Sequence, residues 1–205
     1  MARLAESVIA YQRRLTYLLD CLTRVDVARS RRELRAFDVD LLYESTFLAS
    51  VALFEAMLED ILIEAVCGPR GAQPGSYALV KPRSRERFRT ILRRGRPYVD
   101  LMPFDRALEL AGFYVNGAMP FGAVPTVDRT LLREVVLTRN AIAHRSEAAS
   151  RSFRNDVPGV GGLSRNRQRP GPFLQSIYRA TPRQSRTDLY LGALGRISGD
   201  LLNAW

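Results

Sequence analysis

The chain of 205 residues has very little histidine, cysteine and lysine. The single histidine, His144, excludes a metal site built from several histidines within one protomer. Cys21 and Cys67 are too few for a disulfide framework and lack the spacing of metal ligands, which predicts reduced thiols in a cytoplasmic protein. Lys81 is the only lysine, so 30 of the 31 basic residues are arginine.

Long apolar runs and targeting signals are also missing. No run approaches the roughly 18 apolar residues that a membrane span requires. The first 20 residues carry charges throughout, unlike the apolar centre of a signal peptide. Glycine-rich phosphate loops, zinc-ligand spacing and a Ser-His-Asp constellation are absent as well. The sequence therefore predicts a cytoplasmic protein with no membrane contact, no metal and no cofactor.

The positive charge is what the chain has in excess. The formal net charge is +10, and the isoelectric point is about 10.4. Such a surface attracts polyanions, of which nucleic acid is the usual one. A GC-rich genome explains why arginine replaces lysine, but it does not explain 31 basic against 21 acidic residues. The charge therefore favours contact with nucleic acid.

Apolar residues recur at helical spacing along most of the chain. No strand-like run or internal repeat is present, which predicts an all-α fold, an up-and-down helical bundle with a short-helix insertion. We expect one domain over residues 1–205, with its core in 6–149 and 185–204 and a basic, Gly/Pro-rich loop at 150–183. Residues 26–37 leave open whether the first helix continues, and 69–82 read as a loop. The predicted helices are 6–25, 38–66, 84–94, 103–114, 127–149 and 185–204.

The histidine belongs to the segment "TRNAIAHRSE", residues 138–147. On a helix with about 100° per residue, Arg139 falls inside the apolar arc. Asn140 and His144 lie one turn apart at its edge, and Ala143 has almost no side chain. The pattern predicts a shallow notch flanked by a guanidinium, an amide and an imidazole.

An arginine in an apolar arc needs a partner, because burying an unpaired charge is costly. Glu55 lies in the middle of the apolar face of the 38–66 helix, as does Glu44, and Glu59 lies at its edge. We expect Glu55 to meet Arg139 or His144 across a helix contact. The alternative is an ordinary buried ion pair that only orients two helices.

The hexapeptide "RNAIAH" has the Arg-x4-His form of HEPN domains, and the chain resembles this family of α-helical proteins from toxin–antitoxin, antiviral and RNA-processing systems. Asn140 after the arginine and the small Ala143 before the histidine belong to the match. An earlier helix with a core-facing acid, "LFEAMLEDIL", is also similar. The resemblance covers residues 38–149 and, loosely, the closing helix.

This resemblance implies a metal-independent endoribonuclease, a toxin or antiviral defence effector whose Arg139 and His144 face those of a second protomer in a homodimer. Imidazole can give or take a proton near neutral pH, and guanidinium can bind phosphate oxygens bidentately. Asn140 would orient the imidazole or contact phosphate. The predicted catalytic residues are Arg139, Asn140, His144 and Glu55. Toxins silenced by adenylylation have tyrosine two residues after the histidine. Here Ser146 stands there, so that control is not expected.

Arginines elsewhere are candidates for contact with the RNA backbone. Segment 83–96 is rich in arginine, although a solvated helix face explains it nearly as well. Segment 150–183 either rims the site or is a disordered linker, and its Phe173 and Tyr178 are candidates for stacking on bases. The predicted RNA-binding residues are Arg133, Arg145, Arg93, Arg94, Arg167 and Arg169.

Two other functions compete with the ribonuclease. The first is a catalytically inactive HEPN adaptor that dimerises and binds RNA or a partner protein, such as an antitoxin or a defence-system component. The second is a basic helical regulator that binds DNA, which the sequence disfavours because no helix-turn-helix with a tight turn is evident. Toxicity of expression in bacteria, and its loss after His144→Ala, would separate the ribonuclease from the adaptor.

Overall fold

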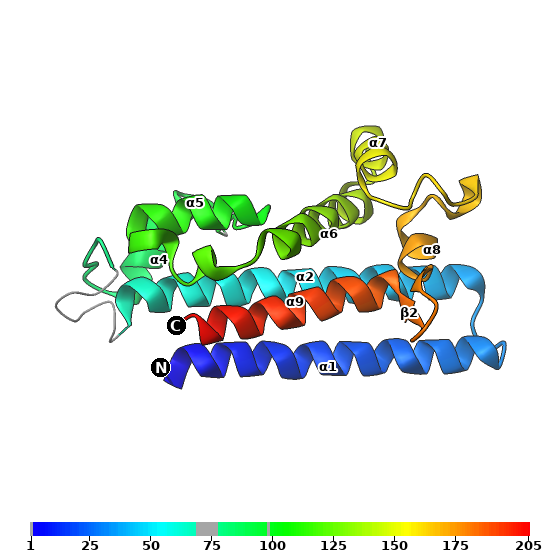
Figure 1. Cartoon of the computed structure of the whole chain (residues 1–205), viewed down its shortest axis with the longest axis horizontal. Coiled ribbons are helices and arrows are strands. Elements are labelled where there is room, and N and C mark those ends of the chain that lie inside the picture. Colours follow the sequence, from blue (N-terminus) through cyan, green and yellow to red (C-terminus); the bar gives the residue numbers. More distant parts are fainter. Residues whose placement is uncertain (1, 69–77, 98) are drawn as a thin grey trace. The chain divides into compact units, whose positions relative to one another are not determined.

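The computed structural model describes residues 2–68, 78–97 and 99–205 (Figure 1). This part of the chain is mostly helical, and its only paired strands are β1 (Ile177–Arg179) and β2 (Gln184–Ser185), which run antiparallel. The predicted all-α class is confirmed, whereas the finer assignment to a HEPN-like bundle stays a prediction. The α-helices are α1 (Ala2–Ser30), α2 (Ala36–Cys67), α4 (Arg85–Arg93), α5 (Phe104–Tyr114), α6 (Thr126–His144), α7 (Glu147–Asp156), α8 (Pro170–Leu174) and α9 (Arg186–Asn203).

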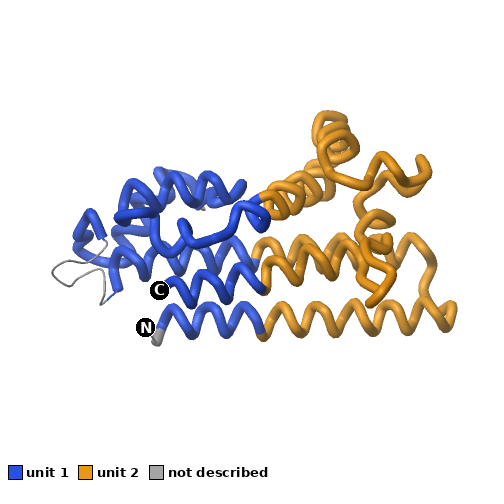
Figure 2. Tube along the Cα trace, in the orientation of Figure 1, with its two compact units in different colours: residues 1–12, 53–129, 196–205 blue, residues 13–52, 130–195 orange. Residues whose placement is uncertain are grey.

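The chain divides into two compact units (Figure 2). Unit 1 comprises residues 1–12, 53–129 and 196–205, and unit 2 comprises residues 13–52 and 130–195. The sequence predicted a single domain over residues 1–205, whereas the structure has two compact units. The long helices α1, α2, α6 and α9 contribute residues to both.

Unit 1 has an aromatic core and a charged network. The ring of Phe88 in α4 meets Tyr114 in α5 edge-on, with centroids 5.0 Å apart. Phe104 at the start of α5 packs near Phe121 of the short 3-10 helix η2 (Phe121–Ala123), and both side chains are fully buried. These contacts bury the apolar side of the short helices that the sequence predicted as an insertion.

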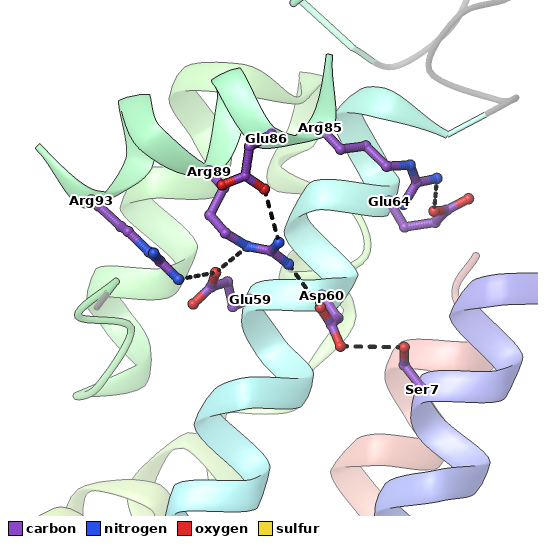
Figure 3. A network of polar contacts seen from close by, with 8 residues as sticks. All are labelled: Ser7, Glu59, Asp60, Glu64, Arg85, Glu86, Arg89 and Arg93. Atoms are coloured by element: carbon purple, nitrogen blue, oxygen red, sulfur yellow. Dashed lines mark hydrogen bonds and ion pairs between the residues drawn. The ribbon is translucent and has the colours of Figure 1, made fainter. Parts of the chain in front are cut away.

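Arginines on one side of α4 bind acids on α2 (Figure 3). The Nε of Arg89 donates to Glu59 at 2.8 Å, Arg93 lies 3.8 Å from the same carboxylate, and Arg85 pairs with the buried Glu64. These ion pairs form a network and are partly buried. They therefore orient α4 on α2 more effectively than isolated ion pairs on the surface would. Part of the arginine-rich segment 83–96 therefore has a structural role.

In unit 2, segments of four helices pack around shared aromatic residues. Tyr190 of α9 lies edge-on to Phe47 of α2, with ring centroids 6.1 Å apart. The Tyr190 hydroxyl donates to Glu134 of α6 at 2.8 Å. The Tyr43 hydroxyl of α2 donates to Asp26 of α1 at 2.8 Å. Tyr190 therefore ties the helix that carries the motif to the rest of the unit.

Several helix boundaries agree with the sequence. The Ser84 side chain accepts a hydrogen bond from Arg87 N at the start of α4, as predicted for an N-cap. Ser185 and Asp188 form the predicted capping box before α9: the Ser185 backbone donates to the carboxylate at 2.8 Å, and Asp188 N donates to the Ser185 hydroxyl at 3.1 Å. The first helix continues through 26–30, which the sequence had left open. Most of the predicted loop 69–82, namely 69–77, lies outside the described residues.

The motif helix is shorter than predicted. It was expected to run to residue 149, but α6 ends at His144. Arg145 adopts a left-handed backbone with φ of 46°, and Ser146 then caps α7 by accepting a hydrogen bond from Ala149 N at 3.2 Å. Arginines also adopt left-handed backbone at Arg32, just after α1, and at Arg94, the C-cap of α4. Glycine would usually occupy such positions.

Segment 150–183 is more regular than predicted. It holds most of α7, the 3-10 helix η3 (Arg165–Arg167), α8 and β1. Phe153 and Phe173 are fully buried and meet edge-on at 5.3 Å, which anchors the segment to the core of unit 2. Of the helices described, none combines the length and the apolar character that crossing a bilayer requires.

Candidate functional site

The buried side of α6 contains the polar residues Glu134 and Thr138 among apolar ones. Thr138 is fully buried, and Glu134 is 8% exposed, beside the apolar Leu132 and Val135. The Thr138 hydroxyl donates to the Glu134 carbonyl at 2.9 Å, and the Glu134 carboxylate accepts from Tyr190. Burial is tolerated because these polar groups are hydrogen-bonded.

This arrangement corrects the predicted placement of Arg139. The sequence placed it inside the apolar arc, whereas its side chain is half-buried and lies at the margin of the buried face. The buried face is turned toward Thr138, about 100° away on the helix. Val136 is only half-buried, and Ala143 is exposed, so the side next to Arg139 is open.

The three polar residues of the motif occupy that open side. Arg139 Nη1 donates to Asn140 Oδ1 at 3.0 Å. His144 follows Asn140 by one turn and is the last residue of α6, where its side chain is exposed. Within the described part of the chain, the imidazole has no hydrogen bond or ion pair.

Glu44 is the acid that unit 2 brings near the end of α6. Its Oε1 accepts a hydrogen bond from the backbone of Gly171 in α8 at 2.9 Å. Burial raises the pKa of Glu44, while that hydrogen bond and the charges of Arg145 and Arg169 oppose the rise. The sequence had noted Glu44 on a core face but had chosen Glu55 as the partner of the motif.

The predicted role of Glu55 stays a prediction. Glu55 is half-buried in the part of α2 that belongs to unit 1, whereas Arg139 and His144 belong to unit 2. Its neighbour Glu59 binds Arg89 and Arg93 of α4 (Figure 3).

The predicted RNA-binding arginines separate into two groups. Arg133, Arg145, Arg167 and Arg169 lie in unit 2 with the motif, and all four are exposed. Arg93 and Arg94 lie in unit 1, where Arg93 is half-buried and bound to Glu59, while Arg94 is exposed. Contact with RNA stays a prediction for both groups, and only the first shares a unit with His144.

The two aromatic candidates for base stacking have different surroundings. Phe173 is fully buried, so the prediction that it stacks on bases is wrong, and its ring belongs to the core. Tyr178 is 49% exposed, and the Arg186 guanidinium lies 4.8 Å from its ring centroid. The same guanidinium lies 5.3 Å from the centroid of the Phe173 ring, so Arg186 is close to both aromatic residues.

Sequence reasoning missed the pair of Glu134 and Tyr190. Burial raises the pKa of Glu134, and the hydrogen bond from Tyr190 opposes that rise. Burial and the nearby Glu134 carboxylate raise the pKa of Tyr190, which keeps its hydroxyl protonated as a donor. An acid ten residues before His144 on the same helix was the available signal. The pair holds the motif helix in place from its buried side.

We expect Glu44→Gln to stabilise the fold at pH 7–8. Because burial raises the pKa of Glu44 in the folded state, the carboxyl favours folding when protonated, and that contribution is lost as the pH rises through the raised pKa. The amide oxygen can still accept from Gly171. Thermal melts at several pH values should show a higher melting temperature for the variant near neutrality, with the difference shrinking toward pH 4. Glu147→Gln, an exposed glutamate of the same unit, is the control and should show no such trend.

Within the residues that the structure describes, no group of three or more His, Cys, Asp or Glu side chains is placed to hold a metal ion. Comparisons of the chain with protein-family models, curated proteins and solved structures give no match. A function for this site must therefore be argued from its residues and their geometry.

Proposed function

We propose that this chain is a metal-independent endoribonuclease whose active site forms between the motif helices of two copies. The observation that carries the proposal is the arrangement at the end of α6. There Arg139, its hydrogen-bonded neighbour Asn140 and the exposed His144 lie on one open side of the helix. The net charge of +10 suits an RNA substrate.

The three side chains match the needs of RNA cleavage by the substrate's own 2′-hydroxyl. One imidazole takes the proton of the 2′-hydroxyl as its oxygen attacks phosphorus, and a second, protonated imidazole gives a proton to the departing 5′-oxygen. The guanidinium of Arg139 binds the phosphorane oxygens, where negative charge accumulates. Asn140 orients that guanidinium through the 3.0 Å hydrogen bond to its side-chain oxygen.

A second copy supplies the second imidazole. One chain contains a single histidine, so a pair of acid and base imidazoles requires His144 of the partner subunit. Ala143 is exposed beside His144, and a residue with so small a side chain allows a second helix to approach closely. Val136 and Leu137, half-buried in one chain, supply apolar surface for such a contact.

The resemblance of "RNAIAH" to the Arg-x4-His motif of HEPN domains supports the same chemistry and suggests a toxin or antiviral defence effector. Ser146 occupies the place of the tyrosine that is adenylylated in some toxins. Here its hydroxyl caps α7, which is a structural role. Regulation through that position is therefore not part of the proposal.

The reaction products test this function. We expect the purified protein to cleave single-stranded RNA in the presence of a chelator and to leave 2′,3′-cyclic phosphate ends, because the nucleophile belongs to the substrate. DNA of the same sequence should remain intact, since it lacks the 2′-hydroxyl. Electrophoresis and mass spectrometry of the products measure both results. A strict requirement for a divalent metal, or cleavage of DNA, would contradict the mechanism.

The oligomeric state is a second measurement of the same proposal. Light scattering should find a dimer at micromolar concentration, and a cross-link between cysteines introduced at Ala143 should form across it. A monomer that cleaves RNA at a rate proportional to its concentration would exclude the composite site.

A non-catalytic adaptor is the second candidate, favoured by exposed apolar side chains at the start of α2. Phe37 is 71% exposed and Leu41, one turn later, is 46% exposed, which suits contact with a partner protein. A folded dimer that binds RNA but cleaves none of a broad pool of sequences would favour this function over the ribonuclease.

A further inference from the structure

Unit 2 contains a cleft of about 540 Å³ whose rim carries several arginines. Arg29 comes from the end of α1, Arg167 from η3, and Arg169 from the residue before α8. Arg183 comes from the turn between β1 and β2. We call this the arginine cleft. Asp40 is the only acid in its lining, so the cleft has a clear excess of positive charge.

Two of these guanidinium groups are available to a ligand. Arg29 donates to the Gln175 side chain at 2.7 Å, and Arg169 lies 3.4 Å from Asp40. Arg167 and Arg183 are exposed, and in the described part of the chain their guanidinium groups form neither ion pairs nor hydrogen bonds. The charge of Asp40 is already engaged by Arg169 and by Gln175, whose amide donates to it at 2.7 Å.

Close packing and hydrogen bonds hold the elements that line the cleft together. Gly171 at the start of α8 approaches α2 so closely that an added Cβ would lie 2.8 Å from the Asp40 side chain. Gln175 joins three elements, because it accepts from Arg29 of α1 and donates to Asp40 of α2 while standing at the end of α8. These contacts hold α8 against α1 and α2 beside the cleft.

The chemistry of the lining matches a ribonucleotide. A volume of about 540 Å³ lies within the range of small-ligand sites. Leu163, Pro172 and Ile177 supply apolar surface for a base, whereas Asn166 and Ser176 supply polar groups for its edge or its sugar. A single arginine can bind two phosphate oxygens at once, in a bidentate geometry.

Arginines also connect this cleft to the motif. Arg145, the residue after His144, and Arg169 in the cleft wall both act electrostatically on the carboxylate of Glu44. Glu44 in turn binds the backbone of Gly171 in α8. Within unit 2, Arg145 after α6 and Arg169 of the arginine cleft therefore both lie near one carboxylate, that of Glu44.

We propose that the arginine cleft binds a nucleotide of single-stranded RNA next to the one that is cut, with its phosphate held by Arg167 and Arg183. The inference rests on the proposed ribonuclease function, because it assigns where the substrate strand continues beyond His144. A free mononucleotide shares the same phosphate and base, so the test must separate it from a strand.

The test measures RNA binding in a background that cannot cut. A short fluorescent oligoribonucleotide is titrated with the full-length His144→Ala protein, and anisotropy gives Kd at several salt concentrations. We expect Arg167→Ala combined with Arg183→Ala to raise Kd about 10- to 100-fold, since each removes a charged hydrogen bond to phosphate. The slope of log Kd against log salt should fall by about 1.4, or about 0.7 for each lost contact with a single strand.

Arg13→Ala combined with Arg14→Ala is the matched control. It removes the same charge from exposed positions of α1, about 22 Å along that helix from Arg29, and should change Kd less than about threefold. Adenosine monophosphate should compete with the labelled RNA only weakly. Equal loss of affinity in both double variants, or tight binding of the mononucleotide with none of the strand, would overturn the inference.

The same measurements separate the two proposals. If the wild-type chain cuts no RNA but the cleft variant still loses affinity and salt dependence, the ribonuclease fails, and the cleft stands as a binding site for single-stranded RNA only. If the wild-type chain cuts RNA and the cleft variant binds it normally, the ribonuclease stands and the cleft fails. Because Arg167 and Arg183 are exposed, thermal melts should show that both double variants remain folded.

Discussion

His144→Ala is expected to reduce RNA cleavage by about two to four orders of magnitude. That range is the usual contribution of a positioned acid or base, and in a symmetric dimer the substitution removes both imidazoles at once. The measurement is the initial rate on a single-stranded substrate in the presence of a chelator. His144 is exposed at the last residue of α6, so the melting temperature should hardly change.

Arg139→Lys tests whether the guanidinium, rather than positive charge alone, is needed for cleavage. Lysine keeps the positive charge but cannot bind phosphate oxygens bidentately as the Arg139 guanidinium can. We expect a large loss of rate with little loss of stability, because Arg139 lies at the margin of the buried face rather than inside it. Arg151→Ala, an exposed arginine on α7, is the control and should retain the wild-type rate. If the His144→Ala variant cleaves RNA at the wild-type rate, the proposed role of the motif in catalysis is wrong.

Phe173→Ala should cause the largest loss of stability among the substitutions considered. The ring is fully buried, meets Phe153 edge-on at 5.3 Å, packs near Tyr190 at 6.4 Å and lies under the Arg186 guanidinium. Replacing a buried phenylalanine by alanine costs about 3–5 kcal/mol. In a chain of this length, that corresponds to a fall in melting temperature of about 6–20 °C.

Tyr178→Ala provides the comparison, at the other aromatic residue near Arg186. Tyr178 also lies near the Arg186 guanidinium but is 49% exposed, so its removal should cost about 1 kcal/mol or less. Circular dichroism melts of the two variants measure the contrast. Similar melting temperatures would show that the buried position assigned to Phe173 is wrong.

Local signals in the sequence predicted much of the secondary structure. The long apolar periodicity located α2, and the caps Ser84 and Ser185 located the starts of α4 and α9, because capping chemistry depends on residues only a few positions apart. The break after His144 was missed, since no glycine or proline stands there and Arg145 adopts a left-handed backbone instead. The regular structure within 150–183 was missed because its helices are too short to show periodicity.

Helical spacing predicted which residues of the motif lie together, but not what surrounds them. Arg139, Asn140 and His144 share one side of α6 as expected, since helical spacing alone determines that. The direction of the buried face depended on Thr138 and Glu134, whose burial requires hydrogen bonds that involve Tyr190, 56 residues away from Glu134. The nearness of Glu44 on α2 to Arg145 likewise depends on tertiary packing, which no local pattern encodes.

The left-handed arginines after α1, α4 and α6 have a consequence for engineering. A residue with a Cβ in this conformation costs about 1–2 kcal/mol, but arginine adds a positive charge at the end of the helix that carries partial negative charge. Glycine at Arg32 or Arg94 would therefore relieve the strained backbone conformation but lose a favourable charge at the end of the helix. Both positions are remote in sequence from the motif. The same exchange at Arg145 would also remove the cation next to His144. A more thermostable version of this chain should be sought at the first two positions, with the third left as it is.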